Sequence, residues 1–222
     1  MSADGFPGAP SDWLPGVAVG LTEQPQQARS RRTTGQILDA AEQLLAADGV
    51  ENLTMAAVSK RAGVSIGAIY GRFEGKSGLL RAVKDRALHQ LEAELGDRYE
   101  APPSGVEDVV RQLVEAVAPA GRRRLLEPAL EAEGVPLGQR EALARQRLAF
   151  MFKDAARGCR PQIAHPSPSV ALEVAFRLVM AGLASYDEMT RTSEGEPLPL
   201  DALRGELIRA VTSYLCGGGA RP

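Results

Sequence analysis

The chain has 222 residues, which is enough for one large domain or two small ones with a real hydrophobic core. Its 26 lysines and arginines against 28 aspartates and glutamates give a net charge of −2, which does not by itself indicate a nucleic-acid partner. Two cysteines, Cys159 and Cys216, are too few for a disulfide framework or a metal cluster, so we expect reduced thiols.

The N-terminal stretch is rich in proline, glycine, serine and glutamine and lacks sustained periodicity, which predicts a flexible leader over residues 1–28. It has no basic segment followed by an apolar core, so it does not look like a secretory signal. The most apolar run, residues 170–186, is interrupted by Glu173 and Arg177 and cannot span a bilayer. We therefore expect a cytoplasmic protein that makes no membrane contact.

A short basic run over residues 29–32 comes next. Arg31 and Arg32 are placed to contact phosphates or to enter a DNA minor groove, and the alternative is a solvated tail. Residues 33–48 then have the pattern of an amphipathic helix that ends at Gly49. Its buried stripe consists of Ile37, Ala41, Leu44 and Leu45.

Residues 53–76 predict two short helices joined by a tight turn. Thr54 is a good N-cap for the first helix, because its hydroxyl can accept a backbone N–H of the first turn. Gly63 follows that helix, at the place where a residue of positive φ is commonly found. Ser65 can cap the second helix, which is expected over residues 66–73. This arrangement is a helix-turn-helix, whose second helix fits the major groove of B-DNA, about 12 Å wide.

The preceding helix is expected to pack behind the helix-turn-helix and to hold it rigid. The apolar positions of the two short helices complete this small core, namely Met55, Val58, Ala62, Val64, Ile69 and Phe73.

These residues resemble the N-terminal domain of TetR-family transcriptional regulators over roughly residues 33–86. The family usually has histidine at the position of Arg72. The resemblance implies an all-α protein that binds DNA through this domain and a small effector molecule through its C-terminal part. The matching positions are Leu53, Thr54, Ala62, Gly63, Val64, Ser65, Gly67, Ile69, Tyr70, Phe73, Lys76, Leu79 and Leu80.

The second short helix begins with small or apolar residues, which cannot make the bidentate base contacts of arginine, asparagine or glutamine. Gly67 permits close approach of the helix to DNA, and Ile66 or Ala68 can pack on a thymine methyl group. Arg72 can bind a guanine or a phosphate. Lys76 lies at the beginning of the next helix, where the free backbone N–H groups favour a phosphate. We expect DNA contacts from Arg31, Arg32, Thr54, Ser65, Ile66, Gly67, Ala68, Tyr70, Arg72 and Lys76.

The charge distribution agrees with a DNA-binding segment. Residues 26–90 contain ten lysines and arginines and six acidic residues, a charge of 10 − 6 = +4, which leaves −6 for the rest of the chain. A basic module on an acidic remainder is typical of a DNA-binding domain joined to another domain.

The remainder of the chain also reads as helical, with breaks at proline- and glycine-containing segments. We expect an N-terminal three-helix helix-turn-helix DNA-binding domain over residues 29–76 and a helical regulatory and dimerisation domain over residues 77–222. The predicted helices of the second domain are residues 77–99, 104–118, 121–133, 137–158, 169–189 and 200–215.

The predicted helix over residues 169–189 is apolar on two faces, so one face can pack in the core and the other in an interface. In regulators that look like this chain, the last two long helices pair with the same helices of a second subunit. We therefore expect a homodimer, which a palindromic operator requires because each half-site takes one recognition helix.

The C-terminal helices can enclose a mainly apolar pocket, and the family resemblance implies a small apolar or amphipathic effector there. Ordinary core packing is the alternative role for each candidate lining residue. These candidates are Met151, Phe152, Phe176, Met180 and Tyr186.

Other functions fit the sequence less well. Residues 63–67 match G-x-S-x-G, the nucleophile elbow of serine hydrolases, but that elbow needs a β-strand before it, and Ser65 follows a predicted helix. His89 and His165 have no metal-ligand spacing, and we expect no enzyme activity, cofactor or metal. A further alternative is that the same DNA-binding module belongs to an activator, or that a protein partner controls it without a small-molecule effector.

Overall fold

The computed structural model describes residues 25–119, 139–192 and 198–217, and every regular element in these ranges is a helix. This confirms the all-α fold class predicted from the sequence. The α-helices are α1 (Pro25–Asp48), α2 (Met55–Ala62), α3 (Ile66–Tyr70), α4 (Gly75–Arg98), α5 (Val106–Val117), α8 (Gln139–Ala155), α9 (Pro168–Ala184), α10 (Tyr186–Thr192) and α11 (Leu200–Leu215), with a 3₁₀-helix, η1 (Ala156–Gln162), after α8.

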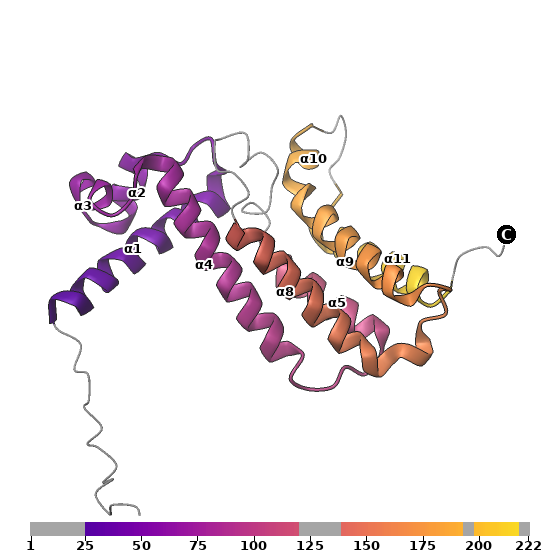
Figure 1. The fold of residues 1–222 in the computed structure, drawn as a ribbon. Coiled ribbons are helices and arrows are strands. Elements are labelled where there is room, and N and C mark those ends of the chain that lie inside the picture. Colours follow the sequence, from indigo (N-terminus) through magenta and orange to yellow (C-terminus); the bar gives the residue numbers. More distant parts are fainter. Residues whose placement is uncertain (1–24, 120–138, 193–197, 218–222) are drawn as a thin grey trace, which may run out of the picture.

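Helix α4 connects two groups of helices (Figure 1). At one end it packs against α1, beside which α2 and α3 lie, and along its length it runs beside α8. Helices α9 and α11 lie on the other side of α8 and α5. No helix in the described parts of the chain has both the length and the apolar character needed to cross a bilayer.

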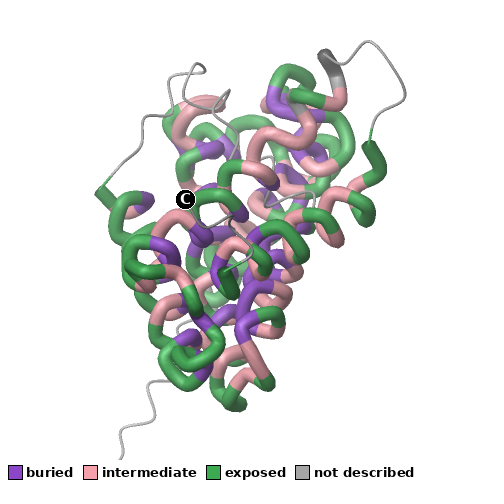
Figure 2. The backbone as a smooth tube through the Cα atoms, turned by 90° about the vertical axis from the view of Figure 1, so that its right-hand side faces the viewer, coloured by how far each residue is buried: buried purple, intermediate pink, exposed green. Residues whose placement is uncertain are grey.

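The first apolar core lies under the helix-turn-helix. Buried and exposed positions follow one another along the helices of the whole molecule (Figure 2). All four residues predicted for the α1 stripe are buried, and so are Val58, Ile69 and Phe73 of the following helices. The first half of α4 closes this core through Leu79, Leu80, Val83 and Ala87. The core therefore continues past residue 76, where the sequence placed the end of the DNA-binding domain.

Helix α1 begins earlier than predicted. Residues 1–24 of the predicted leader lie outside the described residues, but the helix starts at Pro25 rather than at residue 33. Proline is well accommodated in the first turn of a helix, and the residues that follow it include good helix formers. Residues 25–28 are thus helical, and Arg31 and Arg32 lie on a helix, which corrects the prediction of a leader and a non-helical arm.

The second core surrounds α5, whose apolar positions from Val106 to Val117 are buried among α4, α8, α9 and α11. The Phe152 ring of α8 lies against the Phe176 ring of α9, with their centroids 6.2 Å apart. The second half of α4 contributes Leu88, Leu91 and Leu95. Helix α4 therefore belongs to both cores.

Three further predicted helices are shorter or divided in the structure, and a fourth lies outside the described residues. Helix α3 ends at Tyr70 rather than at residue 73, with Gly71 at its C-cap. The predicted helix over residues 169–189 is two helices, because α9 ends at Ala184, where the Ser185 hydroxyl donates to the Ala181 carbonyl at 2.8 Å. Helix α8 stops at Ala155 and continues as the 3₁₀-helix η1, which contains Pro161. The predicted helix over residues 121–133 lies outside the described residues, whereas α11 has the predicted bounds.

Candidate nucleic-acid interface

The turn between α2 and α3 is fixed by short-range hydrogen bonds. The backbone N–H of Ala57 donates to the Thr54 hydroxyl at 3.1 Å, which caps α2 as predicted. Gly63 has φ of 67°, in the left-handed region that favours glycine. The Ser59 hydroxyl donates to the Val64 carbonyl at 2.6 Å, on the other side of the turn. These contacts set the angle at which α3 leaves α2.

Helix α3 has one face in the core and one face in solvent. The Ser65 hydroxyl caps it by accepting the Ala68 N–H at 3.2 Å. Ile69 is fully buried, whereas Ile66 is 44% exposed and Tyr70 is 56% exposed. The outer face therefore presents one aliphatic side chain and one phenol, the residue types expected at a DNA-facing surface.

Gly67 lies on this outer face without any packing reason for glycine. A Cβ atom at this position would meet nothing within 4 Å, and its φ is not in the positive range. Glycine inside a helix costs about 0.5–1 kcal/mol of stability relative to alanine. The described residues therefore impose no packing requirement for glycine at position 67.

Polar groups lie at both ends of α3. The Arg72 guanidinium donates to the Ala68 carbonyl at 2.8 Å and is otherwise exposed at the end of the helix. The Thr54 and Ser65 hydroxyls use their oxygens as caps, and a hydroxyl that accepts in this way still has a proton to donate. Lys76 is half-buried in the first turn of α4. These groups suit contacts with phosphate oxygens.

Two cations counted in the basic segment serve other purposes. Arg86 of α4 binds Asp39 and Glu42 of α1 at 2.8 Å each, which fastens α4 to α1. The Lys84 ammonium binds Glu141 of α8 at 2.6 Å, and both side chains are buried. These two cations therefore join helices to one another within the fold. Arg31 and Arg32 are exposed near the beginning of α1.

Comparison with known proteins agrees with this arrangement. Residues 37–83 match the family model described as bacterial regulatory proteins, tetR family. The chain is 33% identical over 93 residues to the HTH-type transcriptional regulator TtgW of Pseudomonas putida, covering 42% of this chain and 66% of the relative. It is 31% identical over 101 residues to the HTH-type transcriptional regulator AcrR of Shigella flexneri. This match covers 44% of this chain and 47% of AcrR.

The chain carries an N-terminal domain of the TetR family. Its fold is also that of the fatty acid degradation regulator FadR from Bacillus halodurans, with a TM-score of 0.61 at 16% identity over 86% of this chain and 97% of that one. A TetR transcriptional regulator from Rhodococcus sp. RHA1 has a TM-score of 0.53 at 21% identity, over 86% of this chain and 100% of that one. The chain spans 66%, 41% and 47% of the lengths of the three relatives that it matches by sequence.

The G-x-S-x-G motif of residues 63–67 does not lie in a nucleophile elbow. Helix α2 precedes residues 63–67, where the elbow requires a β-strand. The Ser65 hydroxyl is engaged as the cap of α3.

In the described part of the chain, no one groove is lined by all five predicted effector residues. Phe152 is fully buried, and its ring contacts Phe176. Phe176 and Met180 also line a groove between α8 and α9, whereas Met151 lines a separate groove between α4 and α8. The Tyr186 hydroxyl donates to the Leu198 carbonyl at 2.9 Å, away from either groove.

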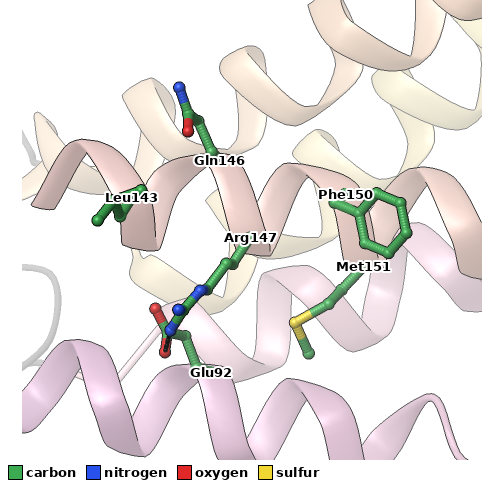
Figure 3. Close-up of a pocket in the computed structure, with 6 residues that line it drawn as sticks. All are labelled: Glu92, Leu143, Gln146, Arg147, Phe150 and Met151. Atoms are coloured by element: carbon green, nitrogen blue, oxygen red, sulfur yellow. Dashed lines mark ion pairs between the residues drawn. The ribbon is translucent and has the colours of Figure 1, made fainter. Parts of the chain in front are cut away.

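The groove between α4 and α8 has a volume of about 390 Å³ (Figure 3). Arg147 and Met151 extend from α8 toward α4, and Arg147 lies 3.5 Å from the Glu92 carboxylate. Arg140 binds both oxygens of Glu92, at 2.8 and 3.2 Å, and this bidentate contact holds the pKa of Glu92 below its usual range. The apolar pattern of the helix predicted over residues 137–158 places Leu143 on its inward side, but Leu143 is 49% exposed at this groove.

The groove between α8 and α9 is larger, at about 500 Å³. Phe176, Met180, Ala149, Ala181 and Ala184 supply its apolar lining. Arg145 and Arg177 bring guanidinium groups to the same groove, from α8 and α9 respectively. This groove combines apolar surface and positive charge.

The sequence did contain a signal for the buried Lys84–Glu141 pair, which sequence reasoning missed. Lys84 falls four residues after Leu80 and four before Leu88, on the buried side of α4. Glu141 precedes Ala144 and Leu148 at the same kind of spacing on α8. A cation and a carboxylate at core positions of two helices indicate that they pair, because a buried charge without a partner is very unfavourable.

Proposed function

We propose that the chain is a sequence-specific DNA-binding transcriptional regulator that acts as a ligand-responsive repressor. One observation supports this most directly. Helix α3 is capped at Ser65 and anchored by Ile69, and it turns Ile66, Gly67 and Tyr70 toward solvent. A short helix held this way at the second position of a helix-turn-helix has the form that enters a major groove.

The side chains at the interface suggest how the DNA is read. Arg72, Lys76 and the hydroxyls of Thr54 and Ser65 would hold phosphates, and Arg31 and Arg32 would extend the contact along α1. Ile66 and Ala68 would pack on thymine methyl groups, and Gly67 would let α3 lie close to the duplex. Affinity would then depend strongly on salt, with part of the specificity coming from DNA shape.

A dimer follows from the same proposal, because a palindromic operator presents two half-sites. The outer face of α9 carries an aliphatic stripe that the other described helices leave largely exposed. Val170 is 56% exposed and Leu178 is 48% exposed, with Val174 and Ala181 on the same face. The stripe suits pairing of α9 and α11 with the same helices of a second subunit. The functional units are then the helix-turn-helix with the first half of α4, and the helices that follow.

Fluorescence anisotropy of the full chain on the DNA upstream of its own gene, at two salt concentrations, tests the proposal. A specific complex should form with a Kd of about 10⁻⁸–10⁻¹¹ M and survive non-specific competitor DNA. Arg72→Ala and Lys76→Ala should each weaken binding and reduce the slope of log affinity against log salt by about 0.9. Arg157→Ala, an exposed arginine on η1, is the control. Unchanged affinity and slope in both interface variants would refute the assignment of these DNA contacts.

A further inference from the structure

Two carboxylates near the groove between α8 and α9 are each shared by two cations. Glu141 binds Lys84 at 2.6 Å and Arg145 at 2.8 Å. Glu173 binds Lys153 at 2.5 Å and Arg177 at 2.7 Å. Each group of three side chains therefore carries one surplus positive charge.

The surplus charge lies where a ligand can reach it. The Arg145 side chain is 46% exposed and that of Arg177 is 75% exposed, and both line the groove. The carboxylate of Glu173, which Lys153 and Arg177 both bind, also lines the groove, and the rest of the lining includes Phe176, Met180, Ala149 and Ala184. A molecule that fills this groove well must bring an apolar body and a negative group.

Arg145 also connects the groove to the DNA-binding half of the chain. Its partner Glu141 is 4% exposed, and the partner of Glu141, Lys84, is 7% exposed. Lys84 lies on α4 between Val83, which packs in the N-terminal core, and Leu88, which packs in the C-terminal core. The ion pairs thus run without a gap from the groove, through the first turn of α8, to the helix that closes the core under α3.

We infer that the groove between α8 and α9 binds an apolar organic anion, and that the Arg145–Glu141–Lys84 chain of ion pairs couples this binding to the position of α4. This rests on the proposed function, since it names the effector class and the route of its signal. The anionic group of the ligand competes with Glu141 for the Arg145 guanidinium. Glu141 is buried, so the loss of one donor is unfavourable and is relieved by a shift of α8 against α4.

The coupling has a direction that thermodynamics fixes. A ligand shifts an equilibrium only by its different affinity for the two states. The anion favours the state in which Arg145 has left Glu141, and DNA favours the state in which Lys84, Glu141 and Arg145 are joined. Each ligand must then weaken the other by the same factor.

Calorimetric titration of the full chain without DNA tests the site, with decanoate and decan-1-ol as matched probes. Decanoate should bind roughly tenfold or more tightly than the alcohol, because a hydrogen bond to a charged group is stronger. The Arg145→Gln/Arg177→Gln variant should lose this preference. Arg147→Gln, on the same helix but in the other groove, should keep it. Equal binding of both probes would overturn the site.

A second copy of the chain is the competing occupant of this groove. If decanoate does not bind and the double arginine variant changes the sedimentation coefficient of the protein, the groove is a subunit contact and the proposed site is wrong. Thermal unfolding of each variant separates these outcomes from a failure to fold.

Anisotropy on the operator fragment tests the coupling separately. Saturating decanoate should lower the DNA affinity of the wild-type chain by roughly 5–150-fold. The Lys84→Met/Glu141→Gln variant leaves neither charge buried alone and should still bind decanoate, while its DNA affinity no longer responds. A response as large as that of the wild type would overturn the relay. If the wild-type chain does not bind DNA at all, the proposed function fails, but calorimetry still decides the anion site.

Discussion

The helix-turn-helix unit and the regulatory helices take their geometry from contacts of different range along the chain. In the first, the bonds Thr54–Ala57, Ser59–Val64 and Ser65–Ala68 join residues three to five positions apart. In the second, the Val106 N–H donates to the Gln162 side chain 56 positions away, and Arg140 binds Glu92 at a separation of 48. The geometry of the helix-turn-helix thus depends largely on contacts between residues close together in the sequence. The geometry of the C-terminal helices depends on contacts between residues far apart in the sequence.

This difference has a functional consequence. A local unit keeps its shape while its position changes, because its defining bonds do not involve the rest of the molecule. The contacts of the C-terminal helices lie between elements, so under the proposed function these helices would change how they meet when a ligand or a subunit binds. Helix α4 takes part in both cores, and in that proposal it is the element that joins the two halves.

The largest effect is expected from removing a long-range contact in the regulatory core. Phe152→Ala takes away a fully buried ring that lies against Phe176, which should lower the free energy of unfolding by about 3–5 kcal/mol. Phe150→Ala, two positions away with 62% of its side chain exposed, should change it by no more than about 0.5 kcal/mol. Urea denaturation followed by circular dichroism measures both. Equal losses of unfolding free energy in the two variants would contradict the burial of Phe152 and the exposure of Phe150 in this structure.

A smaller effect is expected where the contact partner is a second chain. Leu178→Arg places a charge on the outer stripe of α9 and should weaken the dimer by roughly thirtyfold, the effect of losing about 2 kcal/mol at an interface. Leu143→Arg, at a similarly exposed position on α8, should leave the dimer intact. Sedimentation equilibrium compares the two. If Leu143→Arg disrupts the dimer and Leu178→Arg does not, the subunits meet through α8 instead.

The local unit is predicted to respond in opposite directions in stability and in DNA binding. Gly67→Ala should stabilise the protein by about 0.5–1 kcal/mol, since a Cβ meets nothing within 4 Å, and should weaken specific DNA binding by about tenfold or more. Gly205→Ala in α11 also has open space and should gain stability without losing DNA affinity. Thermal unfolding and anisotropy measure the two quantities. Unchanged DNA binding in Gly67→Ala would mean that α3 does not approach the duplex closely.

The range of the contacts also explains how much the sequence could predict. The caps at Thr54 and Ser65, the positive φ of Gly63 and the buried face of α3 follow from residue types a few positions apart, and the structure confirms them. The periodicity of α4 and α5 indicated their buried stripes equally well, whereas in α11 only Val211 and Leu215 are buried. Periodicity does not state which helix a stripe will meet, so it placed Leu143 inside.

The same limit applies to the candidate effector residues. Phe152 and Phe176 do meet, but Met151, Met180 and Tyr186 lie at different places, because apolar residue type alone does not distinguish core from groove. The charged lining of the groove between α8 and α9 was missed because Arg145 and Arg177 each have a glutamate four positions away on the same helix. From the sequence they look like ordinary surface ion pairs.

The smallest effect concerns the ion pairs that join α4 to α8. The bidentate contact with Arg140 holds the pKa of Glu92 below its usual range in the folded state. Since the folded pKa is lower than the unfolded pKa, Glu92 contributes stability above its unfolded pKa and loses it as the pH falls through the folded value. Glu92→Gln should therefore flatten the acid side of the stability curve and cost about 1 kcal/mol or less near neutral pH.

Glu107→Gln, at an exposed carboxylate in the first turn of α5, should leave the acid side of the curve unchanged. Urea denaturation of the three proteins between acid and neutral pH measures the difference. The double variant Glu92→Gln/Arg140→Gln extends the test, because Arg140 also binds Asp85 at 3.0 Å. An acid side that flattens only in the double variant would show that the contact between α4 and α8 depends on Asp85 rather than on Glu92. Such a result would move the long-range link between the two halves about two turns closer to the buried Lys84.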